Sequence, residues 1–462
     1  MRFSQLKNAR VAILGAGREG QAVWRQIRKR YPDKPLSLFA EADIDDDFLR
    51  ALDPVLDDCQ IGPFEFERLN QFEVLIRSAG ISPYRQEMLK LRQSGKQFTS
   101  ASSLWFAENP DARTICISGT MGKSTTAKLT AHLLSHAGVK VCLAGNIGKH
   151  MLDTTESDID WWVIELSSYQ ISDLEAKPDV VLLLNLSEEH VDWHGNAERY
   201  AADKLRLAEL AGEGRVIVNF SDAKLAERFA GQPGVIWFNH KMTWRTSEGG
   251  VIDSNEKIVF APASLPGAHN MQNLAAALTV IDELGLMVNN LDEALSSFRG
   301  LPHRQQFIGE KAGVRYINDS ISTTPVSVAA ALQTIGTKDV VLLLGGMDRG
   351  LDWTGFAAQL VEQTPYAIIT LPDNGATISA CLKSAGVKPP GGMHASLQLS
   401  DAVELAQSLA PKNGCILLSP GAPSFPQFKD YEDRGRQFEK YAAIVQRLPC
   451  SIGIEKGSGR AH

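Results

Sequence analysis

Short runs of uninterrupted apolar residues alternate along this chain with longer segments in which apolar residues recur at helical spacing. The apolar runs, rich in valine, isoleucine and leucine, predict strands at residues 11–14, 114–118, 162–166, 180–185, 216–219, 340–344, 367–371 and 416–419. Runs without alternating polar positions are typical of parallel strands that are buried on both faces. Because strands that alternate with helices form βαβ units and doubly wound sheets, we expect an α/β protein.

The length of the chain predicts more than one domain. At 462 residues, and with roughly 150 residues per domain, about three domains are expected. One boundary is expected near Asn109-Pro110, just before a predicted strand, and the other near Gly300, after a helical stretch rich in alanine and leucine. The predicted domains are 1–109, 110–299 and 300–450, followed by a polar, glycine-rich tail at 451–462.

The composition narrows the classes of partner and the compartment. A net charge of −7 and a sequence pI near 5.9 argue against a nucleic-acid partner held by bulk charge. The six cysteines form no CxxC pair, a usage that fits a reducing cytoplasm better than a disulfide framework or a zinc site. No apolar run reaches the roughly 18 residues that a membrane helix needs, and a predicted strand begins too early for a signal peptide. We expect a soluble, cytoplasmic protein with no membrane or nucleic-acid partner.

One segment carries the chemistry of a phosphate-binding loop. The sequence CISGTMGKSTTAKL, residues 116–129, follows an apolar run, turns at Gly119 and places the glycine, lysine and hydroxyls of 122–125 before a helix-like segment. Backbone N–H groups, a lysine and a hydroxyl for Mg²⁺ are the groups that such a loop supplies. The common NTPase version has a further glycine at the position of Ile117, so this loop is one step tighter.

A second glycine-rich turn, GAGREG, spans Gly15 to Gly20 after a predicted strand, and Glu41 follows about 20 residues later. Alone, this pattern would suggest a dehydrogenase. The region before the phosphate loop, however, is long enough for one mononucleotide-binding half and not for the paired halves that a dinucleotide needs. The turn can instead hold the diphosphate of another nucleotide conjugate, or be a tight strand–helix turn without a ligand.

Further polar groups follow the predicted strands of the middle region. Glu165 emerges where the apolar run WWVI stops, and a carboxylate in the same module as Lys123 and Ser124 suits Mg²⁺. The segment NLSEEHVDWHG offers His190 and His194. A lone histidine is more often structural than a ligand, but His190 lies just beyond a strand's carboxyl end, where α/β sheets place their ligands.

Lys204 is a candidate whose role depends on context. It lies with Arg206 on a segment of helical spacing, RYAADKLRLAE. By spacing alone, a solvated helix face is the favoured interpretation.

Taken together, these segments resemble the Mur ligase family, the ATP-dependent amide ligases of peptidoglycan precursor synthesis. The phosphate loop is similar to the family pattern G-T-x-G-K-[ST]-[ST], with Met121 where the family most often has asparagine. Other similar segments follow in the family's order over nearly the whole chain: GNIG (145–148), ELSSYQ (165–170), EEH (188–190), Lys204, GAHNMQN (267–273), LPHR (301–304), NDSISTTP (318–325), GGMDRG (345–350) and SPGAPSFPQFKDYEDRG (419–435).

Within the family, the chain resembles the second-step ligases, which join glutamate to UDP-N-acetylmuramoyl-L-alanine and release ADP and phosphate. The resemblance implies a three-domain α/β fold. Its parts are a Rossmann-like N-terminal domain for the UDP-sugar, a central P-loop ATPase-type parallel sheet for ATP, and a Rossmann-like C-terminal domain for the amino acid. It also implies an acyl-phosphate intermediate and ATP with Mg²⁺ or Mn²⁺ as cofactors; we expect a monomer.

The resemblance implies roles for individual residues. Catalytic roles fall to Lys123, His190 and Lys204. ATP binding is implied for Gly119, Thr120, Met121, Gly122, Lys123, Ser124, Thr125, Asn270, Asn273, Arg304 and Asp319. Metal binding is implied for Ser124, Glu165, His190 and Lys204, the lysine as its carbamate. UDP-sugar binding is implied for Gly15, Gly17, Arg18, Glu41, Ser78, Ala79, Gly80, Asn146, Ser167 and Gln170, and glutamate binding for Thr323, Arg349, Ser424, Phe425 and Tyr431.

The loop that orients the amino acid departs from the family pattern. The usual D-glutamate enzymes read D-S-K-A-T-N, whereas this chain reads DSISTT at 319–324, so Ile321 replaces the lysine and Thr324 the asparagine. Loss of a cation beside an anionic site matters because a charge-assisted hydrogen bond is roughly twice as strong as a neutral one. The altered loop favours the branch of the family that adds L-glutamate, with D-glutamate as the alternative.

Competing interpretations are separated by sequence features. A folylpolyglutamate-synthase-like ligase shares the phosphate loop but lacks an N-terminal glycine-turn domain of this kind. Other Mur ligases, which add a diaminoacid or a dipeptide, have different C-terminal signatures. A nucleotide-gated regulator would keep the phosphate loop without needing Glu165, His190 and Lys204. We therefore expect an acid–amino-acid ligase of cell-wall synthesis.

Overall fold

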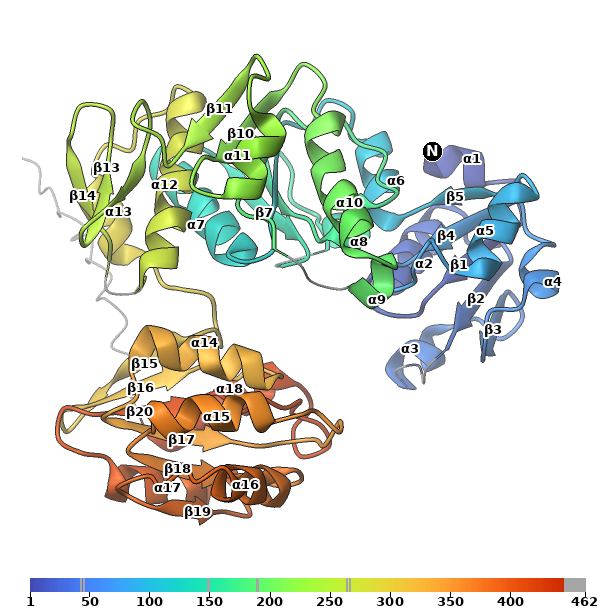
Figure 1. Ribbon diagram of the computed structural model, residues 1–462. Coiled ribbons are helices and arrows are strands. Elements are labelled where there is room, and N and C mark those ends of the chain that lie inside the picture. The colour runs from blue at the N-terminus through green and yellow to red at the C-terminus, as the bar shows by residue number, and fades with distance from the viewer. Residues whose placement is uncertain are drawn as a thin grey trace, which may run out of the picture. The chain divides into compact units, whose positions relative to one another are not determined.

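A computed structural model describes residues 1–41, 44, 46–147, 150–187, 191–262, 265 and 267–443. The chain forms two compact units, the first ending at Phe298 and the second beginning at Arg299. The first unit contains two parallel sheets and a small antiparallel sheet, and the second contains one mixed sheet (Figure 1). Among the described residues, no helix is long and apolar enough to cross a membrane.

The N-terminal sheet has five parallel strands in the order β3-β2-β1-β4-β5. They are β1 (Val11–Leu14), β2 (Leu36–Ala40), β3 (Asp57–Ile61), β4 (Val74–Arg77) and β5 (Gln97–Thr99). The helices are α1 (Phe3–Leu6), α2 (Arg18–Arg30), α3 (Asp46–Ala51), α4 (Phe66–Leu69), α5 (Gln86–Gln93) and α6 (Ala101–Glu108). The strand order reverses between β1 and β4, so the glycine turn after β1 lies at the switch point where such sheets bind ligands.

The middle sheet has six parallel strands in the order β11-β10-β9-β6-β8-β7. They are β6 (Thr114–Ser118), β7 (Val141–Gly145), β8 (Trp161–Glu165), β9 (Val180–Leu183), β10 (Arg215–Asn219) and β11 (Val235–Phe238). The helices are α7 (Lys123–His136), η1 (Met151–Asp153), α8 (Ser168–Ile171), α9 (Val191–His194), α10 (Ala197–Leu210) and α11 (Ala223–Phe229). Strand β6 is flanked by β8 and β9, which brings the phosphate loop next to the ends of both neighbours.

An antiparallel sheet and two helices complete the first unit. The strands β12 (Arg245–Ser247), β13 (Gly250–Ile252) and β14 (Ile258–Phe260) precede α12 (Ala268–Glu283) and α13 (Leu291–Ser297). Helix α12 packs along α7, the helix that follows the phosphate loop (Figure 1). This packing joins two segments that are more than a hundred residues apart in the sequence.

The second unit is a six-stranded sheet in the order β15-β16-β20-β17-β18-β19. Only the β15–β16 pair is antiparallel. The strands are β15 (Gln306–Lys311), β16 (Val314–Asn318), β17 (Val340–Leu344), β18 (Ala367–Thr370), β19 (Met393–Ala395) and β20 (Cys415–Leu418). The helices are α14 (Pro325–Ile335), α15 (Thr354–Glu362), α16 (Gly375–Ser384), α17 (Leu399–Leu409) and α18 (Tyr431–Ala442).

The prediction of an α/β fold built on parallel sheets is confirmed. Each predicted strand has a counterpart, and those at 11–14, 114–118 and 340–344 coincide with β1, β6 and β17. The strand predicted at 180–185 is shorter, because the residues after Leu183 run beside the phosphate loop, where Thr120 N donates to Asn185 O at 3.0 Å. Strands β12 to β14 were not predicted, since segments of three residues are too short to show a periodicity.

Candidate active site

The phosphate loop connects the end of β6 to the start of α7. Gly122 caps α7 with φ of 81°, a left-handed conformation that glycine adopts without strain. A Cβ at this position would lie 2.4 Å from Asn273 Oδ1, so a larger residue would also displace the Asn273 side chain. The loop is held from the other side by Asn185, whose Oδ1 accepts from Met121 N at 2.8 Å and whose Nδ2 donates to Met121 O at 3.0 Å. Lys123 Nζ donates to Thr120 O at 2.8 Å.

The two asparagines of α12 lie together against this loop. Asn273 Nδ2 donates to Asn270 Oδ1 at 3.0 Å, and both side chains are buried. Since Asn273 also contacts Gly122, the structure brings these residues next to the phosphate loop, as an ATP-binding role requires.

Glu165 is the last residue of β8, which is hydrogen-bonded to β6 with Glu165 opposite Ile117. Its side chain is 1% exposed, and Oε1 accepts from Asn146 Nδ2 at 3.2 Å. Within the described part of the chain, Oε2 has no hydrogen-bond partner. A buried carboxylate oxygen without a donor suits a hard cation such as Mg²⁺. Ser124, on the first turn of α7, is buried as well.

Lys204 lies on α10 and reaches the phosphate loop. Its side chain is 3% exposed, so a solvated helix face is excluded. Lys204 Nζ donates to Gly119 O at 2.6 Å and lies 4.9 Å from the ring centroid of Tyr200, one turn earlier. The hydroxyl of Tyr200 lies 2.9 Å from Thr120 Oγ1. Tyr200 was not among the predicted site residues, although its spacing of four residues from Lys204 places both on one helix face.

The other candidates of this region differ in what the structure shows. Arg206 donates to the backbone carbonyls of Ile171 and Leu174, at 2.8 and 2.6 Å, a contact that fastens α10 to α8. His190 lies outside the described residues. In the described part of the chain, no group of three or more histidine, cysteine, aspartate or glutamate side chains could hold a metal ion.

At the N-terminal sheet, the glycine turn after β1 and the loop after β4 meet. Ser78 Oγ donates to Gly15 O at 3.3 Å, and Ala79 N donates to Glu19 Oε2 at 2.6 Å. Gly17 caps α2, Arg18 is its first residue, and both are exposed together with Gly80. Glu19, which occupies a variable position of the glycine pattern, was not among the predicted site residues.

The turn between β8 and α8 is tied to the same region. Ser167 caps α8 and forms a capping box with Gln170, and Gln170 Nε2 donates to Glu19 Oε1 at 2.9 Å. Glu41, by contrast, forms a bidentate ion pair with Arg85 at 2.7 Å to each oxygen. The hydrogen bonds from Arg85 lower the pKa of Glu41, so the carboxylate is held by Arg85 in its charged form.

In the second unit, Asp319 follows β16 and is 2% exposed. It accepts from Ser322 Oγ at 2.5 Å, Ser419 Oγ at 2.7 Å and Gln305 N at 3.0 Å. Burial raises the pKa of Asp319 to about 6, against the opposing effect of these hydrogen bonds. Arg304 is exposed and attracts the Asp319 charge more weakly.

The residues predicted to bind the substrate glutamate lie on three segments of the second unit. Ser320 Oγ, in the altered loop, donates to Tyr431 O at 2.8 Å, and Ser424 is buried while Phe425 is 61% exposed. Thr323 is half-buried and Arg349 is exposed on the segment after β17.

Arg434, which was not among the predicted site residues, joins two of these segments. It is 0% exposed and donates to Ser320 Oγ, Ser320 O and Ala422 O at 3.0, 2.8 and 3.0 Å. Burial lowers the pKa of Arg434 to about 9. The side chain therefore connects the 319–324 loop with the segment that carries Ser424.

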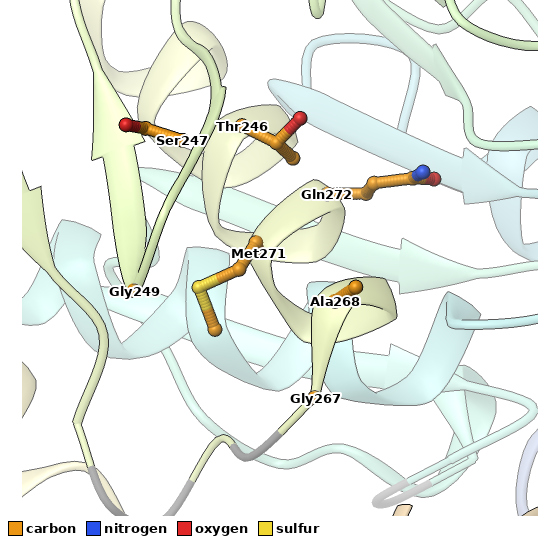
Figure 2. Close-up of a pocket in the computed structure, with 7 residues that line it drawn as sticks. All are labelled: Thr246, Ser247, Gly249, Gly267, Ala268, Met271 and Gln272. Atoms are coloured by element: carbon orange, nitrogen blue, oxygen red, sulfur yellow. The ribbon is translucent and has the colours of Figure 1, made fainter. Parts of the chain in front are cut away.

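A cavity of about 460 Å³ lies on another side of α12, between β12 and the first turns of the helix (Figure 2). Ala268, Met271 and Gln272 line it, and at 3.6 residues per turn they project away from Asn270 and Asn273. The cavity is therefore separated by the helix from the asparagines that contact the phosphate loop.

The fold and site define a class: an α/β nucleotide-binding protein with a phosphate loop at the carboxyl end of a central parallel strand. Residues 117–281 match the family described as Mur ligase middle domain, and residues 303–421 match Mur ligase, glutamate ligase domain. The UDP-N-acetylmuramoyl-L-alanine--L-glutamate ligase of Xanthomonas oryzae pv. oryzae (strain MAFF 311018) is 41% identical over 474 residues, which cover 99% of this chain and 100% of that protein. The ligase of the same name from Xanthomonas euvesicatoria pv. vesicatoria (strain 85-10) is 42% identical, with 99% and 100% coverage. The chain belongs to the Mur ligase family, as its motifs predicted.

A solved structure shows the same fold at low sequence identity. The MurF ligase from Thermotoga maritima in complex with ADP matches with a TM-score of 0.56 and 17% identity, over 94% of this chain and 96% of that one.

Proposed function

We propose that this protein is an ATP-dependent ligase of peptidoglycan synthesis that joins L-glutamate to UDP-N-acetylmuramoyl-L-alanine. The observation that carries the proposal is the convergence of Lys204, Tyr200 and Asn273 on one phosphate loop. The relatives at 41% and 42% identity are named for this reaction, and the more distant neighbour holds ADP.

The reaction requires that the carboxylate of the alanyl group be activated, because a carboxylate is a poor acyl donor. A carboxylate oxygen attacks the γ-phosphorus of ATP, and the bond between the γ-phosphorus and the oxygen that bridges it to the β-phosphorus breaks. An acyl phosphate and ADP form. The amine of glutamate then attacks the acyl carbon and loses a proton, and the tetrahedral intermediate expels inorganic phosphate. A site that keeps water from the acyl phosphate prevents its hydrolysis.

The phosphate loop supplies the groups that bind ATP. Lys123 holds the β- and γ-phosphates, and the backbone N–H groups at the start of α7 favour the same anion. We propose nucleotide contacts for Gly119, Thr120, Met121, Gly122, Ser124, Thr125, Asn270 and Asn273, with Arg304 and Asp319 as contacts of the second unit.

The residues present fit a magnesium ion, with Mn²⁺ as a chemically acceptable substitute. The observation that supports this fit is the buried Oε2 of Glu165, to which no group in the described part of the chain donates. We propose Ser124 and Glu165 as ligands of one ion, and His190 with carbamylated Lys204 as the residues that hold a second one. When bound, the ion neutralises charge on the transferring phosphate. Carbamylation would convert the Lys204 ammonium, which donates a hydrogen bond to Gly119 O in this structure, into an anion.

The first two sheets supply the proposed site for the UDP-sugar. The turn of Gly15, Gly17 and Arg18 and the loop of Ser78, Ala79 and Gly80 serve the diphosphate, and Asn146, Ser167 and Gln170 serve the muramoyl-alanine end. Glu19 supports this assignment, since its two oxygens accept from Ala79 N and Gln170 Nε2 and so join both groups of residues. Glu41 is proposed for the nucleotide end of the same substrate, and its carboxylate is bound by Arg85 in this structure.

For glutamate we propose Thr323, Arg349, Ser424, Phe425 and Tyr431. L-Glutamate is favoured over D-glutamate because Ile321 removes a cation from the loop, and the relatives are named for the L enantiomer.

We further propose that residues 1–109 bind the UDP-sugar, 110–299 ATP and 300–450 the amino acid, and that the protein acts as a cytoplasmic monomer. Neither a nucleic acid nor a membrane is needed as a partner for this reaction.

The proposal is tested by measuring ADP release with ATP, Mg²⁺, UDP-N-acetylmuramoyl-L-alanine and L-glutamate, each omitted in turn. We expect ADP only when the acyl and amine substrates are both present. Lys123→Ala should abolish ADP release while binding of the UDP-sugar persists, and the exposed Lys140→Ala serves as the matched control. Substantial turnover by Lys123→Ala would refute the assignment of the phosphate loop.

A further inference from the structure

A buried chain of hydrogen bonds runs from the N-terminal domain to the start of α8. Tyr84 Oη lies 2.5 Å from Asp203 Oδ1, Asp203 Oδ2 lies 2.6 Å from His194 Nδ1, and His194 Nε2 lies 3.0 Å from Ser168 Oγ. The exposed fractions of His194, Ser168 and Asp203 are 0%, 3% and 7%. None of these residues belongs to the groups proposed above for ATP, metal, UDP-sugar or glutamate.

The direction of the bonds follows from the chemistry of the groups. A carboxylate only accepts, so the Tyr84 hydroxyl and His194 Nδ1 both donate to Asp203. In the neutral ring, Nε2 then accepts from the Ser168 hydroxyl. Both oxygens of the buried carboxylate are thereby satisfied, as burial of a charge demands.

The order serine, histidine, aspartate is that of hydrolase triads, but Ser168 is badly placed to be a nucleophile. It is the first residue of α8 and almost wholly buried. The His194 ring is enclosed by the rings of Trp193, Tyr200 and Tyr169, with centroids at 4.5, 5.2 and 5.6 Å. A nucleophile must reach a substrate carbonyl, so the arrangement points to positioning rather than to covalent catalysis.

Each end of this chain lies beside residues proposed to bind the UDP-sugar. At one end, Ser168 stands between Ser167, which caps α8, and Gln170, which completes the capping box. Holding Ser168 by its hydroxyl therefore fixes the turn that presents both neighbours.

At the other end, Tyr84 closes the loop that begins with Ser78. The same loop is fastened to α9 next to His194: Ser82 Oγ donates to Trp193 O at 2.7 Å, and Trp193 Nε1 donates to Gly80 O at 3.0 Å. The Trp193 ring stacks on Tyr169 of α8 at 4.2 Å. The proposed diphosphate loop and the proposed muramoyl-alanine turn are thus connected through one buried carboxylate.

We propose that Asp203 is a positioning residue for the UDP-sugar substrate, which acts through Tyr84 on the 78–84 loop and through His194 and Ser168 on the first turn of α8. This inference rests on the proposed function, since it names how that substrate is bound. On this proposal, Asp203 contributes to the affinity for the UDP-sugar and not to the affinity for ATP.

The test is the variant Asp203→Asn in the full chain. An amide cannot accept from Tyr84 and His194 with both of its terminal atoms, and it favours the wrong tautomer of the ring. We expect the KM for UDP-N-acetylmuramoyl-L-alanine to rise about tenfold, because that factor corresponds to the loss of one hydrogen bond to a charged group. The KM for ATP should change less than about twofold. Tyr84→Phe and Ser168→Ala each remove one hydroxyl at an end of the hydrogen-bond chain. Both variants should raise the KM for the UDP-sugar by smaller factors.

A double-mutant cycle distinguishes a connected chain from separate contacts. Tyr84→Phe added to Asp203→Asn should have little further effect, because residues of one network are not additive. The matched control is Asp153→Asn, which breaks the ion pair of Arg25 with Asp153 (2.7 Å) between α2 and η1, and should leave the KM for the UDP-sugar unchanged.

Several results would overturn the inference. These are an unchanged KM for the UDP-sugar in all three variants, or KM values for ATP and the UDP-sugar that rise by equal factors. Labelling of the wild type, but not of Ser168→Ala, by a fluorophosphonate would also overturn it in favour of a nucleophilic serine. Absence of ADP release by the wild type with both substrates would instead refute the proposed function, so the two failures are distinguishable.

Discussion

Glu165 and Asn146 meet at the ends of two adjacent strands, where Asn146 Nδ2 donates to Glu165 Oε1 at 3.2 Å. The pair leaves Glu165 Oε2 buried and, among the described residues, without a donor. The asparagine thus fixes the orientation of the carboxylate while its second oxygen stays available to a cation. This relationship is the structural reason for proposing a metal ion beside the phosphate loop.

Glu165→Gln should weaken metal binding while keeping the side chain's size and its hydrogen bond from Asn146. We expect the Mg²⁺ concentration for half-maximal ADP release to rise at least about tenfold, since one anionic ligand is lost. The exposed Glu198→Gln, on the first turn of α10, is the matched control. An unchanged Mg²⁺ requirement would remove Glu165 from the metal site.

Lys204→Ala should be nearly inactive, because the carbamate proposed to support the metal is lost. A small carboxylate such as formate or acetate can occupy the vacated volume, so partial rescue of ADP release is expected. Arg206→Ala, on the same helix, loses backbone contacts to α8 and should not respond to these anions. A ¹³C carbamate signal from labelled bicarbonate should appear in the wild type alone. If neither rescue nor a carbamate signal is observed, Lys204 has only a structural role, the hydrogen bond that it donates to Gly119 O.

Asp319 should make the second unit less stable as pH rises. Its folded-state pKa of about 6 lies above the ordinary value of 3.8, so the folded protein binds the proton more tightly than the unfolded chain does. The contribution is fully present below the unfolded-state pKa and is lost as pH rises through about 6. The loss should amount to about 3 kcal/mol.

This pH dependence is measurable by hydrogen exchange of β16 and β20 amides in the whole chain between pH 4 and pH 7, corrected for intrinsic rates. Asp319→Asn should flatten the dependence, whereas the exposed Asp348→Asn should not. A wild-type opening free energy that rises with pH across this window would contradict the assignment.

The sequence predicted the parts of the site that follow from local pattern. Glu165 could be placed at a strand end because the apolar run before it is continuous, and Gly122 could be placed at a helix start because of the residues around it. The burial of Lys204 could not be predicted from spacing, since it results from packing of α10 against the phosphate loop.

The contacts that join segments far apart in the sequence were also beyond prediction. Glu19 binds Ala79 and Gln170, and Tyr84 binds Asp203, through pairings that only the tertiary structure creates. Arg434 is a further case, because a charged residue is expected at the surface and this one is wholly buried. The hydroxyl and carbonyl oxygens that surround it lie on loops that no periodicity connects.

The central claim is tested most directly by one parallel assay, in which ADP release is measured with UDP-N-acetylmuramoyl-L-alanine and either L-glutamate or D-glutamate. We expect turnover with L-glutamate and little with D-glutamate, because Ile321 and Thr324 replace the lysine and asparagine of the family pattern in the loop proposed to orient the amino acid. A strong preference for D-glutamate would contradict the assigned enantiomer, and no ADP release with either would contradict the assignment of this chain as the glutamate-adding ligase.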